Sequence, residues 1–567
     1  MKNLLLTSLT IFLFLIGCDS SEKIADTIII NGNIATMDTT LAKAEAIAMK
    51  DGKILAVGSN DDIQTYMGEQ TETIDAKGNF VMPGFIEGHG HYLGLGNSLI
   101  KLNLMKTKNW NEIVEMVAEK AKTAQPGEWI IGRGWHQEKW NEELEQQVFG
   151  YPYHDALSAV SPNNPVMLKH ASGHSLFANA KAMELAKISK ETTNPEGGLI
   201  VRKPGGQPVG VFEERAMDQV ESAHQVYVDG LSKADLLEEW MLALRSAEQE
   251  CLKKGVTSFQ DAGSSYTDIQ RYKDLAAKGD LNVRLWAMLD HPYDTMKQQM
   301  AGFPINNVND WFSCRSIKAR VDGALGSYGA WLLKPYDDKP GFNGQNTHSL
   351  DELKNVAALA AKYNMQLCVH AIGDRANREV LNTFENTFKT TAKKELRWRI
   401  EHAQHINIED IPRFSELGVI ASMQGVHCTS DAPFVPKRLG EMRAKLEAYA
   451  WRKIIDSGAM IANGTDTPVE DVNPLASFYA SVTRNVPSLN HEPFFPEQKM
   501  TRQEALASYT INNAYAGFEE KIKGSITVGK LADIVILSND LLNCPDDKIL
   551  KTNILYTIVD GKVAFKK

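Results

Sequence analysis

The sequence predicts an α/β protein in which a (β/α)₈ barrel is accompanied by a composite β-sandwich built from both ends of the chain. Through the middle of the chain, strand-like segments alternate with helical stretches, a pattern typical of a parallel sheet. Eight such strands can be counted, and eight parallel strands close a barrel. At both ends, short apolar strands follow one another around Asn-Gly and Asp-Gly turns, as in antiparallel sheets.

The two end regions, residues 24–82 and 520–567, are expected to form the sandwich together. The first contains TIIINGNIATMD, EAIAMKDGKILAVGS and ETIDAKGNFVMPG, in which β-branched and apolar residues alternate with polar ones. The second repeats this pattern in GSITVGKLADIVILS and ILYTIVDGKVAFK. Two half-sheets at opposite ends of a chain indicate one domain that both ends complete.

The barrel is assigned to residues 83–519. Its predicted strands are residues 84–91, 256–263, 283–289, 317–323, 366–374, 399–405, 419–425 and 461–468. The segment at about 93–254 is too long for a single crossover between the first two strands. Because it contains the Gly/Pro-rich stretch EGGLIVRKPGGQPVG and several helices, we expect an inserted subdomain over the barrel mouth.

The bulk composition excludes several classes of protein. With 567 residues, 43% apolar and 23% charged, the chain is globular and too long for one small core. Its net charge of -10, with acidic and basic residues interleaved, offers no basic block for nucleic acid. The 6 cysteines show no CxxC pairs, which argues against a zinc ribbon or a disulfide scaffold.

The first residues, MKNLLLTSLTIFLFLIGCDSS, have the basic start and short apolar run of a signal peptide, assigned to residues 1–17. Leu15 to Cys18 resemble the bacterial lipobox, which implies that Cys18 is lipidated and begins the mature chain. The alternative is a cysteine that merely follows an ordinary signal peptide. The lipobox predicts an exported protein, anchored by lipid to a bacterial membrane on its periplasmic or outer-surface side.

His89 and His91 end the first predicted barrel strand. Residues two apart on a strand project to the same side, so both imidazoles can meet one ion. This spacing alone is equally compatible with two ordinary polar residues at a strand end. His370, His402 and Asp466 follow the apolar parts of three later strands, and such strand ends converge on one face of a barrel. Nitrogen and oxygen donors without thiolate favour zinc over manganese, iron or nickel.

Lys318 is a charged residue inside a predicted strand, between Ile317 and Ala319. Burial would lower the pKa of this amine, which could then take up carbon dioxide and become a carbamate that bridges two metal ions. The alternative is a lysine that extends outward or pairs with Asp322. Without further evidence, a lysine at this position is expected to extend outward or to pair with Asp322.

The motifs taken in order resemble the amidohydrolase superfamily, and within it the amidohydrolase family 3 branch, which includes N-substituted formamide deformylases. The resemblance covers about residues 28–567 and is carried by PGFIEGHGH, IKARVDGALGS, VHAIGD, RIEHAQ, ANGTDTP and KGSITVGKLADIVIL. It implies first-strand ligands at His89 and His91, and later ligands at His370 and His402. It also implies a carboxylated lysine at Lys318.

By the same resemblance, Asp466 is both a metal ligand and the proton shuttle, and the cofactor is one or two divalent ions. The chain departs from the branch at three positions, with Tyr328 where arginine is common, Gly425 after Gln424, and His136 after Trp135. These departures leave the ligands intact but weaken any transfer of substrate identity.

Other polar residues near these motifs are candidates for supporting roles. We expect His174, Gln424 and His427 to contact substrate, although the two histidines could equally be structural residues in loops. Asp322 and Asp374 are expected to orient the ligating imidazoles.

The predicted reaction is hydrolysis of a non-peptide C–N bond in an amide, formamide, urea or cyclic imide, by metal-activated hydroxide with Asp466 as general base and acid. The expected partners are a small-molecule substrate and a membrane that the protein reaches through its lipid. The sequence is compatible with a homo-oligomer but does not predict one. An ester or phosphoester hydrolase is the rival enzyme, because the same hydroxide attacks those centres. A binding lipoprotein without turnover is the other rival, and an intact set of ligands with a base argues against it.

Overall fold

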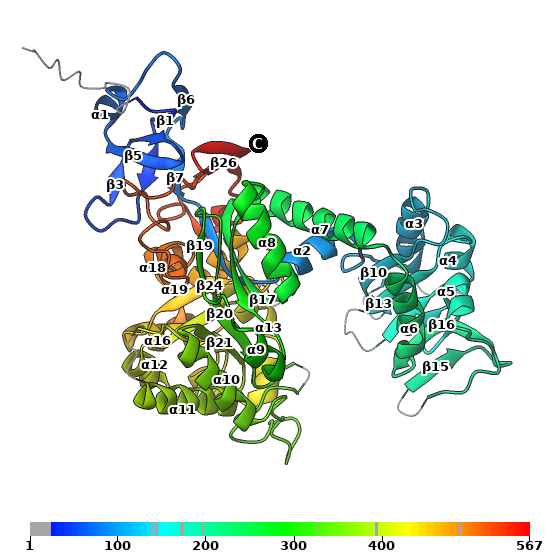
Figure 1. Cartoon of the computed structure of the whole chain (residues 1–567). Helices are drawn as coiled ribbons and strands as arrows, with labels where there is room; N and C mark the ends of the chain where they lie inside the picture. Colours follow the sequence, from blue (N-terminus) through cyan, green and yellow to red (C-terminus); the bar gives the residue numbers. More distant parts are fainter. Residues whose placement is uncertain are drawn as a thin grey trace, which may run out of the picture.

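The computed structural model describes residues 24–137, 140–141, 146–170, 175–195, 198–326, 328–391, 395–486, 490 and 492–567. Figure 1 shows a barrel with β-sheets of the chain ends at one side and the insertion at another. Two predicted positions, Cys18 and His174, lie outside the described residues.

The central sheet contains the eight predicted strands, and all of them are parallel. They are β8 (Phe85–Gly90), β17 (Val256–Ser264), β18 (Arg284–Leu289), β20 (Phe312–Arg320), β21 (Gln366–Ala371), β22 (Arg399–His402), β23 (Ile420–Gln424) and β24 (Ile461–Gly464). The first and last strands meet, because the Asp466 N–H donates to the His89 carbonyl at 2.7 Å. The prediction of an eight-stranded α/β barrel is therefore confirmed.

Helices follow the barrel strands along the chain. They are α8 (Tyr266–Lys278), α9 (Tyr293–Gln299), α10 (Leu350–Tyr363), α11 (Asp374–Thr390), α12 (Ile411–Leu417), α13 (Gly425–Asp431), α14 (Val435–Leu439), α15 (Glu441–Glu447), α16 (Trp451–Asp456), α17 (Pro474–Thr483), α18 (Arg502–Ser508) and α19 (Ile511–Ala516). In α10, Ser349 caps the start by accepting from the Glu352 N–H, and Asn364 ends the helix with φ 58°. Its apolar face packs on the barrel core.

The chain ends form two sheets beside the barrel, drawn in blue and red in Figure 1. One joins, in order, β5 (Lys53–Gly58), β4 (Ala46–Lys50), β1 (Thr27–Ile30) and β6 (Glu72–Asp75). The other joins β27 (Lys562–Lys566), β26 (Ile554–Val559) and β25 (Ile534–Leu537) to β7 (Phe80–Pro83), β2 (Asn33–Ala35) and β3 (Lys43–Ala44). Both ends of the chain thus complete the second sheet, and isoleucines of the two sheets share one buried cluster.

A buried ion pair connects this region to the barrel. Arg284, on β18, contacts Asp533 just before β25, with Nε–Oδ2 at 2.7 Å and Nη2–Oδ1 at 3.0 Å. The two side chains are 1% and 5% exposed, respectively. Such a two-point contact between planar groups fixes both partners in orientation.

The insertion leaves the barrel through α2 (Tyr92–Ile100) and returns through α7 (Lys233–Lys253), and these two helices pack against each other. It contains a six-stranded sheet with the strand order β15 (Gly198–Arg202), β16 (Pro208–Glu214), β14 (Ser175–Ala178), β13 (Val166–His170), β10 (Ile130–Trp135) and β9 (Leu102–Asn103). Its helices are α3 (Trp110–Ala121), α4 (Asp155–Val160), α5 (Ala180–Leu185) and α6 (Met217–Asp229). Figure 1 shows this unit beside the barrel at the far end of α7. The expectation that it lies over the mouth is wrong, because α2 and α7 carry it outward.

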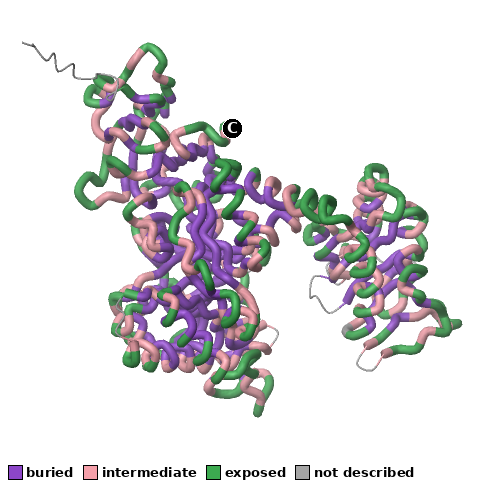
Figure 2. Tube along the Cα trace, viewed as in Figure 1, coloured by how far each residue is buried: buried purple, intermediate pink, exposed green. Residues whose placement is uncertain are grey.

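Figure 2 shows two separate buried regions, one in the barrel and one in the insertion, with α7 running between them. The half of α7 nearer the barrel contributes Leu244, Ala247 and Cys251 to the barrel core, whereas its start is exposed. None of the helices in the described parts of the chain has the length and apolar character needed to cross a membrane.

Five cysteines are described and all are free thiols, namely Cys251, Cys314, Cys368, Cys428 and Cys544.

Candidate metal centre

Histidines and one carboxylate meet at the carboxyl ends of the barrel strands. His89 lies near the end of β8, His91 follows it at the start of α2, His370 and His402 lie near the ends of β21 and β22, and Asp466 follows β24. The ring centroids of His89 and His402 are 4.7 Å apart, and those of His370 and His402 are 4.5 Å apart. The fold therefore gathers these residues although almost 380 positions of sequence separate His89 from Asp466.

Asp466 is the group that connects them. Its Oδ1 lies 3.3 Å from His91 Nε2 and 3.6 Å from His89 Nε2. Its Oδ2 lies 4.0 Å from His402 Nδ1. One carboxylate thus faces three of the histidines that the sequence suggested as ligands.

The donor atoms fit a divalent cation. Two overlapping sets have their ligand atoms within 4.8 Å of one another, His89 with His91 and Asp466, and His402 with His427 and Asp466. Asp466 Oδ1, His370 Nε2 and His427 Nε2 are buried and have no hydrogen-bond partner among the described residues. Buried polar atoms normally have a hydrogen-bond partner. Several unpaired donor atoms in one place therefore indicate a site at which they would bind the same metal ion.

The electrostatics of the site also suit a metal. Burial lowers the pKa of His89 to about 4 and that of His370 to about 3, so both imidazoles are neutral at pH 7. The neutral imidazole is the form that coordinates metal ions. Burial by itself would raise the pKa of Asp466, but the contact with His91 and the neighbouring His402 hold that pKa well below its usual range. The carboxylate is therefore ionised.

The chain turns sharply at two of these residues. His402 has φ 73° and Asp466 has φ 58°, both in the left-handed region of the backbone that residues other than glycine rarely adopt. Each such residue costs about 1–3 kcal/mol, and the cost is tolerated where the surrounding structure enforces the conformation. Both residues are candidate metal ligands, so this backbone conformation also sets where their side chains lie.

Lys318, in β20, points into the barrel. Its side chain is 3% exposed, and its Nζ lies 3.3 Å from His89 Nε2. Desolvation lowers the pKa of this amine. Asp322 does not pair with it, because the Asp322 carboxylate accepts three backbone N–H groups instead. Lys318 is thus an inward-pointing lysine that is not paired with Asp322.

The supporting residues suggested by the sequence divide into two groups. Gln424 is 1% exposed and its Oε1 lies 2.8 Å from His402 Nδ1, so it contacts a histidine of the site. His427 stacks on the His402 ring at 6.2 Å between centroids, and Asp322 Oδ1 lies 3.7 Å from His370 Nε2. Asp374 contacts none of these histidines; its Oδ1 accepts a hydrogen bond from the backbone N–H of Leu333 at 2.9 Å.

Sequence reasoning missed Glu401 and Arg399. Glu401 accepts a hydrogen bond from His89 Nδ1, and Arg399 Nε lies 2.7 Å from Glu401 Oε1. Arg399 also donates to the Gly88 carbonyl at 2.7 Å. All three side chains, of His89, Glu401 and Arg399, are 0% exposed. Charges at alternate positions of an apolar strand, in RIEH, were the available signal.

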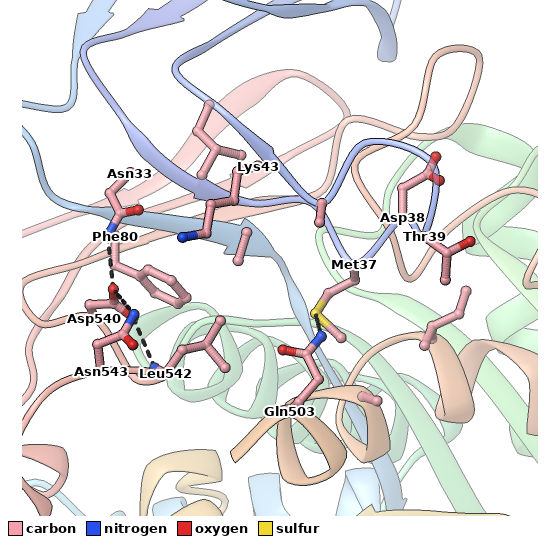
Figure 3. Close-up of a pocket in the computed structure, with 15 residues that line it drawn as sticks. Asn33, Met37, Asp38, Thr39, Lys43, Phe80, Gln503, Asp540, Leu542 and Asn543 are labelled. Atoms are coloured by element: carbon pink, nitrogen blue, oxygen red, sulfur yellow. Dashed lines mark hydrogen bonds between the residues drawn. The ribbon is translucent and has the colours of Figure 1, made fainter. Parts of the chain in front are cut away.

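A separate cavity of about 440 Å³ lies between β2, β7 and α18 (Figure 3). One of its two carboxylates, Asp540, accepts from Asn33, from Asn543 and from the Leu542 N–H, so its oxygens are already engaged. Figure 3 also shows Gln503 directed at the Met37 sulfur, 3.7 Å away. None of the residues proposed as metal ligands lines this cavity, so the metal centre is the catalytic candidate.

Comparison with known proteins agrees with a metal centre at this place. The sequence profile of the amidohydrolase family matches residues 72–565. The chain is 33% identical over 558 residues to Protein LONG AFTER FAR-RED 3 of Arabidopsis thaliana, covering 95% of this chain and 91% of that protein. It is 26% identical over 558 residues to the N-substituted formamide deformylase of Arthrobacter pascens, covering 96% and 99%.

Among solved structures, an uncharacterized metal-dependent hydrolase from Pyrococcus horikoshii superposes with a TM-score of 0.73 at 25% identity, covering 92% of this chain and 99% of that one. The donor set at the barrel mouth of the present chain fits a divalent ion, as expected for a relative of a metal-dependent hydrolase. The chain therefore belongs to the amidohydrolase family and is a metal-dependent hydrolase that acts on carbon–nitrogen bonds other than peptide bonds.

Proposed function

We propose that the protein hydrolyses the C–N bond of a small formamide, amide, urea or cyclic imide, with zinc as its metal and Asp466 as the group that moves the proton. The observation that carries this proposal is the position of Asp466, which contacts His91 at 3.3 Å and His89 at 3.6 Å while remaining ionised. A carboxylate at that point can accept a proton from water and later donate it.

Five residues would hold the metal, namely His89, His91, His370, His402 and Asp466. A divalent cation there would supply Lewis-acid chemistry, acidifying water and polarising the scissile carbonyl. Asp466 would take the proton of the attacking water on a carboxylate oxygen and return it to the leaving nitrogen. Gln424, through His402, and Glu401, through His89, would keep the two imidazoles oriented.

Lys318 supports a site for two ions. Its Nζ lies 3.3 Å from His89 Nε2 within the ring of candidate ligands, and its desolvated amine is suited to carboxylation. A carbamate would add an anionic oxygen donor between the two sets of ligands. The donors are nitrogen and oxygen without thiolate, which favours zinc.

The substrate class rests on the chemistry of the family and on one relative. The relative from Arthrobacter pascens is named for N-substituted formamides and matches over almost the whole of both chains. An N-substituted formamide is accordingly the first compound to test. The proposed location, a bacterial membrane reached through a lipid on Cys18 after export, rests on the lipobox-like residues 15–18.

The test is Asp466→Asn, with Asp456→Asn as a control that removes an exposed carboxylate from α16. The amide keeps size and an oxygen donor but cannot accept the proton. Turnover should fall by about 10²–10⁴, or about 3–5 kcal/mol of transition-state stabilisation, while metal content by elemental analysis stays at one ion or more. The control should keep parental turnover.

A near-parental kcat in Asp466→Asn with metal retained would refute the assignment and direct attention to His427. Assays should pair N-formyl and N-acyl amines with esters of the same acyl group. Hydrolysis of the esters alone would establish the rival ester hydrolase instead.

A further inference from the structure

A second groove, of about 910 Å³, lies on the mouth side of the barrel but outside the metal centre. Segments that follow four different strands line it: residues 333–337 after β20, Asp374 at the start of α11, residues 407–409 after β22, and residues 439–447 in and before α15. The backbone of Trp331 lies against Gly373, where an added Cβ would come within 2.1 Å of the Trp331 oxygen. Neither Asp322 nor His370 lines the groove.

Two buried carboxylates face the groove. Glu447 is 8% exposed and Asp374 is 2% exposed. Glu447 accepts from Asn407 Nδ2 at 3.1 Å, and its Oε2 is buried without a hydrogen-bond partner among the described residues. Asp374 Oδ1 accepts the backbone N–H groups of Leu333 and Arg375, each at 2.9 Å. A buried carboxylate oxygen without a donor is costly, and a cation would remove that cost.

The cations of the groove are engaged elsewhere or exposed. Arg443 directs its three donor groups at backbone carbonyls, those of Leu439, Lys334 and Pro335, at 2.9–3.1 Å. Arg378 pairs with Asp410 at 2.7 Å and with Glu409 at 3.2 Å. Lys334 is exposed. In the part of the chain that the structure describes, no salt bridge therefore reaches Glu447 or Asp374 within 4.0 Å.

The charge balance is acidic, with five acidic residues against three basic ones in the lining. Burial and the charge of Asp374 raise the pKa of Glu447 to about 7, although the nearby charges of Arg443 and Lys334 act to lower it. Burial raises the pKa of Asp374 against the same effect of Arg443. Both carboxylates would thus be stabilised by a cation placed between them. The described residues gather three metal-donor atoms only around Asp466, so this groove does not offer the ligand set of a divalent metal.

Apolar side chains form the rest of the wall and extend to its rim. Ile408 is 50%, Met442 72% and Leu446 39% exposed, and all three line the groove. A ligand that matches both features has one charged end and an apolar body.

We propose that this groove is a binding site for a small primary amine. The ammonium group would lie at Glu447 and Asp374, and an alkyl or aryl body would contact Ile408, Met442 and Leu446. The site is distinct from the metal centre and does not depend on which bond the enzyme cleaves.

The experiment is calorimetric titration of the purified metal-loaded protein with hexylammonium chloride and, separately, with hexan-1-ol, which has the same chain without the charge. Saturable binding of hexylammonium is expected, with the alcohol at least about 10-fold weaker, because the buried carboxylates require a positive partner. Equal affinity for the two compounds would overturn the proposal.

Glu447→Gln should weaken hexylammonium binding at least about 10-fold. Glu416→Gln, which removes an exposed charge on α12 outside the groove, should leave it unchanged. Asp374→Asn, which keeps the acceptor for the Leu333 N–H, provides a second variant if the first does not fold. Binding that persists in both folded variants, or that disappears when the metal is chelated, would place the amine elsewhere and refute the assignment.

Discussion

Replacing Glu401 by glutamine tests how the barrel prepares His89 for a metal. Glu401 is 0% exposed and accepts a hydrogen bond from His89 Nδ1. Because an ionised carboxylate can only accept, the proton resides on Nδ1, and Nε2 is left with its lone pair toward the site. Nε2 is the atom that lies 3.3 Å from Lys318 Nζ and 3.6 Å from Asp466 Oδ1.

Glu401→Gln keeps the shape but removes the negative charge that makes the imidazole a stronger ligand. Loss of such a supporting carboxylate typically costs 10–100-fold in metal affinity, or about 1.4–2.8 kcal/mol. The lost charge also leaves Arg399 without its carboxylate partner, but Arg399 retains hydrogen bonds to the Gly88 carbonyl at 2.7 Å and to Ser422 Oγ at 2.8 Å. The variant should therefore fold with reduced stability.

The assay is zinc competition against a chelator of known affinity, with circular dichroism and thermal unfolding to confirm the fold. Glu72→Gln, on the exposed surface of β6, is the matched control and should bind zinc like the parent. Parental zinc affinity in a folded Glu401→Gln protein would show that His89 is not a ligand or that its tautomer does not depend on Glu401.

Four further outcomes are expected. Arg284→Met should lower the free energy of unfolding in urea by about 3–5 kcal/mol, because it leaves Asp533 buried without its cation; a loss below about 1 kcal/mol would contradict this account. Lys318→Ala should lower the zinc content from about two ions per chain toward one or none, and an unchanged content would exclude a bridging carbamate. In the native protein a thiol reagent should react first with the half-buried Cys544, because the other described thiols are buried, and burial raises the pKa of thiols such as Cys314 to about 12. In denaturant, five of the 6 cysteines should react if the Cys18 thiol carries a lipid, and six would refute lipidation there.

The barrel could be predicted because each of its strands combines an apolar run with a polar end, and this signal is local. VHAIGD and RIEHAQ show it most clearly, and the ligands they suggested, His370 and His402, lie with ring centroids 4.5 Å apart. The terminal strands were also visible, because Asp-Gly and Asn-Gly turns mark their ends.

What could not be predicted depends on contacts between distant segments. Glu401 was not recognised because nothing local indicates that it meets His89, 312 positions earlier in the chain. Nothing local in the sequence indicates that Gln424 lies buried against His402, 22 positions earlier in the chain. The place of the insertion depends on how α2 crosses α7, where Gly96 lets the backbones meet so closely that an added Cβ would come within 1.8 Å of the Ala243 oxygen.

The pairing of α2 with α7 also bears on how the barrel forms. The neighbouring strands β8 and β17 end and begin at Gly90 and Val256, with residues 91–255 between them. Closing a flexible loop of that length costs about 4.5 kcal/mol in chain entropy beyond a constant. An insertion that has already folded holds its two ends together through these helices, so most of that entropy is lost within the insertion itself. The first two barrel strands can then pair as if joined by a short connection.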